Sequence, residues 1–351
     1  MKAAVIEELN KPMVVHSDWP DPQPGPRDAI IRVEANGICR SDWHIWAGDW
    51  AWIGLQLQLP KVIGHEFCGV VEEVGPQVTK FTRGDRVVCP FNFSCGTCEQ
   101  CLAGHQNVCP NVGPAGFVYS GGYGRLAHVP LADLNLVPLP DSIPFVEAAS
   151  MGCRFMTSFH GVVDQARVQA GEWVAVHGCG GIGLAAVHIA SALGANVIAV
   201  DINEKKLAMA KELGATHTVN AAKDDAATAV QQLTNGGAHV AVDALGEAVT
   251  CRNAILSLRT RGRQLQIGLT TKKEQGEVSL PVDLMVVKEL QLIGTVGMQP
   301  HRYPAMLSMV EAGKVKPGKL IGRTVPIEQA GEVLASMTQY ATIGTVVVNQ
   351  W

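Results

Sequence analysis

The sequence predicts an α/β protein with two parts, a β-rich N-terminal domain and a doubly wound parallel sheet. Three observations lead to this prediction. The chain has 351 residues, which is long for one hydrophobic core. Up to about Pro144, short β-type runs stand between glycine and proline turns. From about Glu147, strand-like runs alternate with stretches that can form helices.

The N-terminal part contains runs typical of strands, at residues 29–33, 69–74 and 85–88. Turn residues such as Gly75-Pro76 and Gly84-Asp85 separate them. We therefore expect a β-dominated domain with long loops over residues 1–154.

The next part, residues 155–296, has the pattern of repeated βα units. Strand-like runs at 173–177, 196–200, 238–242 and 263–267 alternate with helix-compatible runs at 182–193, 204–213, 224–233 and 247–258. Such units form a parallel sheet covered by helices. The alternation weakens after about Thr295, and 345–348 predicts one more strand. Residues 297–351 are therefore expected to return to the first domain.

Composition argues against a nucleic-acid or membrane-surface partner. Apolar residues make up 47% and charged residues 17%, with a net charge of −4 and no basic run that would bind nucleic acid or a membrane surface. Glu7 and Glu8 interrupt any export-signal core, so we expect a cytoplasmic protein. Residues 173–200 lack Asp, Glu, Lys and Arg, but their glycines favour a buried strand–helix–strand over a membrane span.

A glycine-rich turn predicts a dinucleotide site. Gly178, Gly180 and Gly183 have the GxGxxG spacing after an apolar run, and Gly181 and Ile182 lie where a helix should begin. Without side chains, the backbone can approach a pyrophosphate, and the helix N-terminus supplies N–H donors.

Asp201 predicts which dinucleotide is used. It ends the second strand-like run, 23 residues after Gly178. A carboxylate there can accept both ribose hydroxyl protons and repels a 2′-phosphate, so we expect NAD rather than NADP. The alternative is an Asp that only caps the following helix.

Four of the ten cysteines form a compact motif. The spacing C-x2-C-x2-C-x7-C can close a tetrahedral zinc site with no position left for a substrate, and it would stabilise a lobe at residues 91–111. An iron–sulfur cluster and disulfides are the alternatives; the final gap of seven residues and the absence of an export signal favour zinc. The four residues are Cys95, Cys98, Cys101 and Cys109.

Cys39, His65 and Cys153 are candidates for a second zinc site. Two thiolates and one imidazole leave zinc an open position, as a catalytic site requires. Each residue also has an ordinary interpretation as a buried thiol or a hydrogen-bonded core histidine. Spacing alone does not show that the three converge.

Taken together and in order, these motifs resemble the zinc-containing medium-chain alcohol dehydrogenases over essentially the whole chain. The matching pieces are Gly-Ile-Cys-Arg-Ser-Asp-Trp-His at 37–44, Gly-His-Glu at 64–66, the four-cysteine lobe, Met-Gly-Cys at 151–153 and the glycine-rich turn. Residues 44–50 particularly resemble the tetrameric microbial members. The resemblance implies a GroES-like catalytic domain and a Rossmann domain. It also implies reversible hydride transfer between a primary or secondary alcohol and NAD, two zinc ions per chain, and a homotetramer, with a dimer as the alternative.

The resemblance further implies roles in catalysis. Cys39, His65 and Cys153 would bind the catalytic zinc, and Glu66 would be an alternate ligand. The remaining roles are Asp42 accepting the other N–H of His65, Ser41 bonding the substrate oxygen, His44 passing the proton to solvent through the cofactor ribose, and Trp50 forming a wall of the substrate cleft.

The cofactor contacts implied by the resemblance are Arg40 on the pyrophosphate, Lys206 near the adenosine ribose, and Ile267, Leu269, Thr295 and Val296 near the nicotinamide half. One position departs from many relatives. Gly344-Thr345 stands where they place an arginine before the final strand. We expect weaker NAD binding or faster NAD release as a result.

Three other functions fit these motifs less well. A zinc-free quinone reductase of the same fold would lack both cysteine sets. A polyol dehydrogenase is closer, but its relatives often carry a carboxylate as the third zinc ligand, where this chain has Cys153. A zinc-stapled nucleic-acid or interaction module would explain only residues 95–109, and the acidic balance argues against it.

Overall fold

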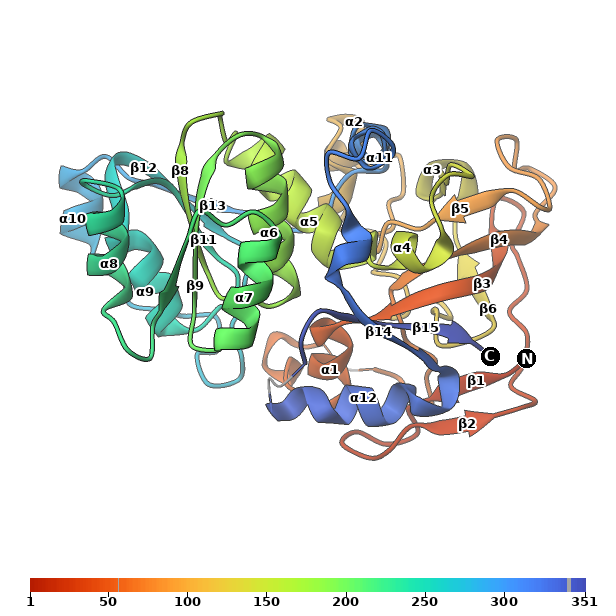
Figure 1. Ribbon diagram of the computed structural model, residues 1–351. Coiled ribbons are helices and arrows are strands. Elements are labelled where there is room, and N and C mark those ends of the chain that lie inside the picture. The colour runs from red at the N-terminus through yellow and green to blue at the C-terminus, as the bar shows by residue number, and fades with distance from the viewer. Residues whose placement is uncertain (56, 340–341) are drawn as a thin grey trace. The chain divides into compact units, whose positions relative to one another are not determined.

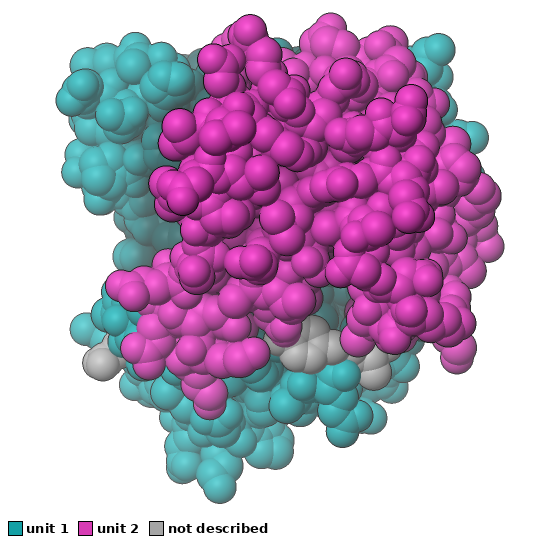
Figure 2. Space-filling view, turned by 90° about the vertical axis from the view of Figure 1, so that its left-hand side faces the viewer, with its two compact units in different colours: residues 1–156, 297–351 teal, residues 157–296 magenta. Residues whose placement is uncertain are grey.

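The computed structural model describes residues 1–55, 57–339 and 342–351 (Figure 1). These residues form two compact units, which Figure 2 colours separately. Unit 1 contains residues 1–156 and 297–351, and unit 2 contains residues 157–296. The C-terminal segment therefore shares a unit with the N-terminal part of the chain.

Unit 1 is rich in β-structure, as predicted. Its main strands are β3 (Ala29–Ile38), β4 (Glu66–Val74), β5 (Arg86–Val88), β6 (Leu126–Val129), β7 (Val137–Pro138), β14 (Ile321–Pro326) and β15 (Thr345–Gln350). They form one sheet in the order β14-β15-β3-β4-β5-β7, with β6 also paired to β3. A separate antiparallel pair consists of β1 (Ala3–Val5) and β2 (Val14–His16).

The helices of unit 1 are short. They are α1 (Arg40–Trp46), α2 (Glu99–Leu102), α3 (Ala132–Asn135), α4 (Phe145–Ala149), α11 (Tyr303–Glu311) and α12 (Ala330–Ser336). Where the chain passes from unit 1 to unit 2, the π-helical turns Met151–Phe155 and His160–Gln165 flank α5 (Met156–Phe159), and the second turn belongs to unit 2. Irregular turns of this kind are frequent at functional sites.

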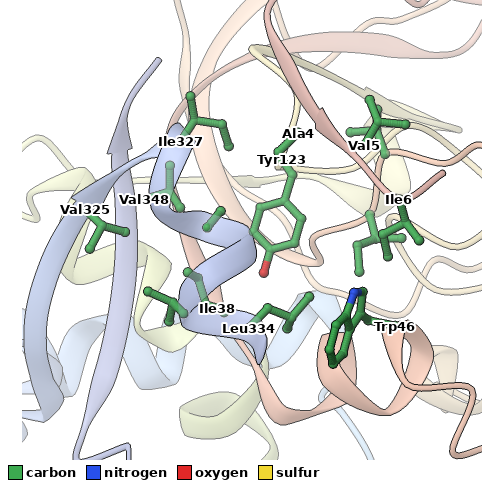
Figure 3. Close-up of a cluster of buried hydrophobic side chains, with 14 of the residues drawn as sticks. Ala4, Val5, Ile6, Ile38, Trp46, Tyr123, Val325, Ile327, Leu334 and Val348 are labelled. Atoms are coloured by element: carbon green, nitrogen blue, oxygen red, sulfur yellow. The ribbon is translucent and has the colours of Figure 1, made fainter. Parts of the chain in front are cut away.

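One hydrophobic cluster of unit 1 connects its two chain segments. It joins residues of β1 and β3 to Ile327, Leu334 and Val348 from the C-terminal segment (Figure 3). The ring of Tyr123 lies among these side chains and is fully buried. Burial of this apolar surface stabilises unit 1 and fixes the position of the tyrosine hydroxyl.

Unit 2 is the predicted doubly wound sheet. Its strands are β8 (Trp173–His177), β9 (Asn196–Asp201), β10 (His217–Asn220), β11 (Ala238–Asp243), β12 (Leu258–Gln266) and β13 (Gln291–Gly294). All pairs are parallel, in the order β10-β9-β8-β11-β12-β13. The helices are α6 (Gly181–Ala192), α7 (Glu204–Glu212), α8 (Ala226–Leu233), α9 (Ala248–Leu256) and α10 (Val282–Val287).

The uncharged run at 173–200 is β8, α6 and β9, which confirms the strand–helix–strand prediction. The edge strands β10 and β13 were not predicted, because four half-exposed residues carry too little periodicity to be recognised. In the part of the chain that the structure describes, no helix is long and apolar enough to cross a membrane.

Candidate zinc and dinucleotide sites

Cys39, His65, Glu66 and Cys153 come together in unit 1. Their ligand atoms lie within 4.8 Å of one another, and all four residues are buried. Cys39 directly follows β3, and the pairing of β3 with β4 places Gly37 opposite Glu66. The first π-helical turn brings Cys153 to the same point. The β3–β4 register and the π-helical turn therefore bring together Cys39, His65 and Cys153, which their spacing in the sequence did not show.

A buried carboxylate orients the histidine of this cluster. His65 Nδ1 lies 2.8 Å from Asp42 Oδ1, while Asp42 Oδ2 accepts hydrogen bonds from the Cys39 amide at 2.9 Å and from the Tyr123 hydroxyl at 3.0 Å. With the Nδ1 proton donated to Asp42, the lone pair is on Nε2. His65 Nε2 is buried and has no hydrogen-bond partner among the described residues. An imidazole nitrogen held this way beside two thiols fits a zinc ion.

The two thiols differ in acidity. A hydrogen bond from Cys153 and the nearby His65 lower the pKa of Cys39 well below its usual value, against the effect of burial. The same bond and burial raise the pKa of Cys153. For His65, burial lowers the pKa, but the charges of Asp42 and Cys39 outweigh it and raise the pKa well above its usual value. These shifts follow from packing thiol, imidazole and carboxylate groups together in one buried site.

Glu66 pairs with a residue that sequence analysis did not single out. Arg154 Nε donates to Glu66 Oε1 at 3.0 Å, and Arg154 Nη2 donates to Oε2. Burial raises the pKa of Glu66 to about 7, although Arg154 opposes the shift. Gly37 and Gly152 make room, since a Cβ on either would clash with Glu66. In the sequence, the one sign of this pairing was a single arginine directly after Cys153 in an otherwise apolar stretch.

His44 is held from two sides. Its Nδ1 lies 2.6 Å from Asp49 Oδ2, and its ring stacks on Trp50 at a centroid distance of 4.5 Å and an interplanar angle of 8°. Burial lowers the pKa of His44, and the bond to Asp49 opposes this. Trp50 is 7% exposed. Sequence analysis missed Asp49, although it stands next to Trp50.

Two further predicted residues belong to α1. Ser41 is half-buried in its first turn. Arg40 donates to the carbonyl oxygen of Met337, and its guanidinium lies 3.7 Å from the centre of the Trp43 ring.

The four lobe cysteines form the second cluster. Cys95 and Cys101 sulfurs are 4.0 Å apart, and those of Cys98 and Cys109 are 3.9 Å apart. All ten cysteines are unpaired, so the disulfide alternative is wrong. Backbone amides point at three of the sulfurs; the Cys95 amide, for example, donates to Cys109 at 3.4 Å. Hydrogen bonds led by those from Thr97 lower the pKa of Cys95 to about 5, which favours the thiolate that zinc requires.

The glycine-rich turn of unit 2 has the geometry that close backbone approach requires. Gly178 has a φ of +91°, and a Cβ on Gly183 would lie 1.8 Å from the Gly178 carbonyl oxygen. Gly180 is the N-cap of α6, with no atom within 4 Å of the place where its Cβ would stand. Gly181 and Ile182 form the first turn of α6, as expected. The turn leaves open space at a helix N-terminus, which fits a pyrophosphate.

Asp201 ends β9 and does not cap the next helix. Its Oδ2 accepts from the Cys179 amide at 2.7 Å, and its Oδ1 accepts from the Asn203 amide at 2.9 Å. The N-cap of α7 is Asn203, whose side chain accepts from the amides of Lys205 and Lys206. The capping alternative for Asp201 is therefore wrong. The backbone bonds hold the carboxylate against the glycine-rich turn.

The residues expected near the nicotinamide follow the carboxyl ends of β12 and β13. Ile267 comes directly after β12 and Thr295 directly after β13, at the same sheet edge as Gly178 and Asp201. Thr295 Oγ1 is buried and has no hydrogen-bond partner in the described structure. Leu269 and Val296 are exposed. Ligands of doubly wound sheets bind at this edge.

Known proteins match the chain throughout. Residues 25–141 match the alcohol dehydrogenase GroES-like domain, and residues 181–312 match the zinc-binding dehydrogenase domain. An alcohol dehydrogenase of Geobacillus stearothermophilus is 35% identical over 349 residues, covering 99% of each chain. The chain belongs to the zinc-containing alcohol dehydrogenase family. A further family relative, an NAD-dependent alcohol dehydrogenase of Sulfurisphaera tokodaii, is 29% identical over 99% of each chain. The crystal structure of an NAD-dependent alcohol dehydrogenase covers 100% of both chains at 33% identity, with a TM-score of 0.89.

Proposed function

We propose that this chain is a zinc-dependent alcohol dehydrogenase that transfers hydride reversibly between an alcohol and NAD, giving an aldehyde or ketone. The observation that carries the proposal is the buried Nε2 of His65, which has no hydrogen-bond partner among the described residues and lies beside the thiols of Cys39 and Cys153. This is the donor set of a catalytic zinc site with one open position.

Cys39, His65 and Cys153 are the proposed ligands. Zinc bound there would act as a Lewis acid that lowers the pKa of an alcohol hydroxyl at the open position. Asp42 fixes the His65 tautomer, and Arg154 holds Glu66, which remains a candidate alternate ligand. Ser41 is the proposed hydrogen-bond partner of the substrate oxygen, and His44 the proposed proton acceptor.

We propose a second, structural zinc at Cys95, Cys98, Cys101 and Cys109. Its support is the closed set of four sulfurs with inward backbone amides. On this assignment, residues 1–154 are the catalytic domain with its lobe at 91–111, residues 155–296 the dinucleotide domain, and 297–351 the return to the catalytic domain.

NAD is the proposed hydride acceptor. Gly178, Gly180 and Gly183 would admit the pyrophosphate, with Arg40 a further contact, and Asp201 would bind the adenosine ribose beside Lys206. The nicotinamide half would meet Ile267, Leu269, Thr295 and Val296. Asp201→Gly should relax the preference for NAD over NADP, measured as the ratio of kcat/KM values. A wild-type enzyme that uses both cofactors equally would contradict the role of Asp201.

The backbone conformation at Gly344, just before the last strand, disfavours the arginine that many relatives carry there. Gly344 has a φ of +69°, and a Cβ there would lie 2.5 Å from the Leu320 carbonyl oxygen. A side chain of any size is strained at this position. We propose weaker NAD binding or faster NAD release as the consequence, to be measured by stopped-flow displacement.

Trp50 is the proposed determinant of substrate size. Its stacking on His44 places a rigid indole beside the proposed proton acceptor. Small or slender alcohols should fit best, because overpacking costs roughly 1–3 kcal/mol. Trp50→Ala should raise kcat/KM for branched or secondary alcohols relative to ethanol. An unchanged ranking in a folded, zinc-loaded variant would remove Trp50 from this role.

We also propose a cytoplasmic homotetramer, with a dimer as the alternative. Unit 2 presents Val286 and Val287 of α10 at 70% and 80% exposure, and Leu292 of the edge strand β13 is also exposed. Exposed apolar side chains such as these are a candidate subunit contact. Light scattering of wild type and Val286→Glu would test it; a monomeric wild type would refute the assembly.

Steady-state rates over primary, secondary, aromatic and polyhydroxy alcohols, followed by NADH absorbance at 340 nm, test the activity itself. We expect NAD-dependent oxidation of simple alcohols that is lost on zinc removal. A clear preference for polyols would favour the polyol dehydrogenase alternative. No turnover with any alcohol by protein that retains zinc would overturn the proposal.

A further inference from the structure

His44 and Asp49 are joined by the backbone as well as by their side chains. The Asp49 amide donates to the His44 carbonyl at 2.8 Å, so the chain turns back on the end of α1. This turn brings the Asp49 carboxylate to His44 Nδ1 at 2.6 Å. Both residues are buried, with Asp49 4% exposed. A short bond between buried partners defines one arrangement of the imidazole rather than several.

Trp50 also restricts the orientation of the His44 imidazole. It follows Asp49 directly and lies nearly parallel to the imidazole. The hydrogen bond limits ring rotation, and the stacked indole limits tilting. With the Nδ1 proton donated to Asp49, the basic nitrogen of neutral His44 is Nε2.

We propose that Asp49 is a positioning residue of the dehydrogenase reaction, which holds His44 as the Nδ1–H tautomer and stabilises its protonated form. This inference rests on the function proposed above. In alcohol oxidation, the alcohol loses its hydroxyl proton through the relay that ends at His44, where an Nε2–H bond forms. The Nδ1 proton stays on the ring, and the Asp49 charge offsets the positive charge that the ring acquires.

Nearby charged groups shift the pKa of His44 in both directions. Arg40, on the same helix, disfavours the imidazolium, while Asp49 and the Cys39 thiolate favour it. Burial also disfavours the charged ring. Asp49 is the one of these groups that bonds the imidazole directly. Its removal should therefore leave a weaker base in the same place.

Asp49→Asn tests the proposal, because an amide keeps the shape and removes the charge. We expect kcat/KM for alcohol oxidation at pH 7 to fall about 10-fold, which is less than the roughly 10²- to 10⁴-fold contribution of a general base, because His44 itself remains. The loss should shrink as pH rises, since bulk base then replaces the relay. Asp18→Asn is the matched control, as it removes one exposed carboxylate from the same unit.

A double-mutant cycle separates positioning from a structural role. His44→Gln should show the same pH-dependent loss, and Asp49→Asn added to it should cost little more, because Asp49 acts through His44. Equal losses from Asp49→Asn in both backgrounds, or a loss independent of pH, would overturn the proposal, as would unchanged kinetics in folded, zinc-loaded Asp49→Asn. A wild type without alcohol oxidation would instead overturn the proposed function.

Discussion

The two sulfur clusters of unit 1 are built in opposite ways. The lobe cluster takes all four cysteines from residues 95–109, and three of them are partly exposed. Its sulfurs are bonded mainly by amides of the same loop. The other cluster, called the distributed cluster below, takes its donors from buried residues far apart in the chain, namely Cys39, His65, Glu66 and Cys153. Its partners, Asp42, Tyr123 and Arg154, also come from separate elements.

The two clusters should therefore depend on their metal in different ways. A loop with few apolar contacts of its own depends on its metal for structure. The donors of the distributed cluster are placed by sheet register and by the hydrophobic core, so the fold can exist without the metal. The lobe cluster should therefore contribute to stability and the distributed cluster to chemistry.

The largest expected effect is loss of activity in Cys39→Ala. Removing a proposed ligand of the open site should reduce alcohol oxidation on the order of 10³-fold or more, since metal charge stabilisation is worth several kcal/mol. Far-UV circular dichroism and Tm should change little. Zinc analysis should show one ion fewer than in wild type; a fully active wild type with one zinc would refute the two-site assignment.

Cys95→Ala should show the opposite pattern. Loss of the lobe metal should lower Tm by about 5–10 °C. The protein that remains folded should keep most of its kcat. Comparison with Cys251→Ala, a buried thiol outside both clusters, separates metal loss from the deletion of a sulfur. Equal Tm values for Cys95→Ala and wild type would show that the lobe does not need its metal.

Arg154→Leu tests whether the distributed cluster depends on charge balance. It leaves the buried Glu66 carboxylate without its partner, which should cost about 3–5 kcal/mol in the free energy of unfolding. Glu66→Gln in the same chain should recover part of that loss, because the unpaired charge is gone. Urea unfolding of the single and double variants measures this coupling. Additive losses would mean that the pair is not energetically linked.

The smallest effect is expected from Tyr123→Phe. It removes one hydrogen bond to Asp42, worth about 1 kcal/mol in stability. Zinc should leave the distributed cluster about 10-fold more readily, because Asp42 then orients His65 less firmly. Tyr119→Phe, a half-buried tyrosine of the same unit, is the control. If both variants release zinc to a chelating dye at the wild-type rate, the core does not support this site.

The sequence by itself determined the features that a few neighbouring residues specify. The lobe cysteines, the glycine-rich turn and the central strands and helices of unit 2 were predictable, because their geometry depends on spacing within one segment. The fold class followed from the change of pattern near residue 147. Asp201 was recognised as well, but its alternative role as a helix cap was excluded only by the bond pattern around Asn203.

Features that depend on sheet register and on burial could be seen only in the folded chain. Spacing could not bring Cys39 to His65 and Cys153, which the β3–β4 register and a π-helical turn do. Nor could it pair Arg154 with Glu66, because their 88 residues of separation carry no periodic signal. Hydrogen bonds and ion pairs gain their strength from the low dielectric of the interior, and burial is a property of the folded chain.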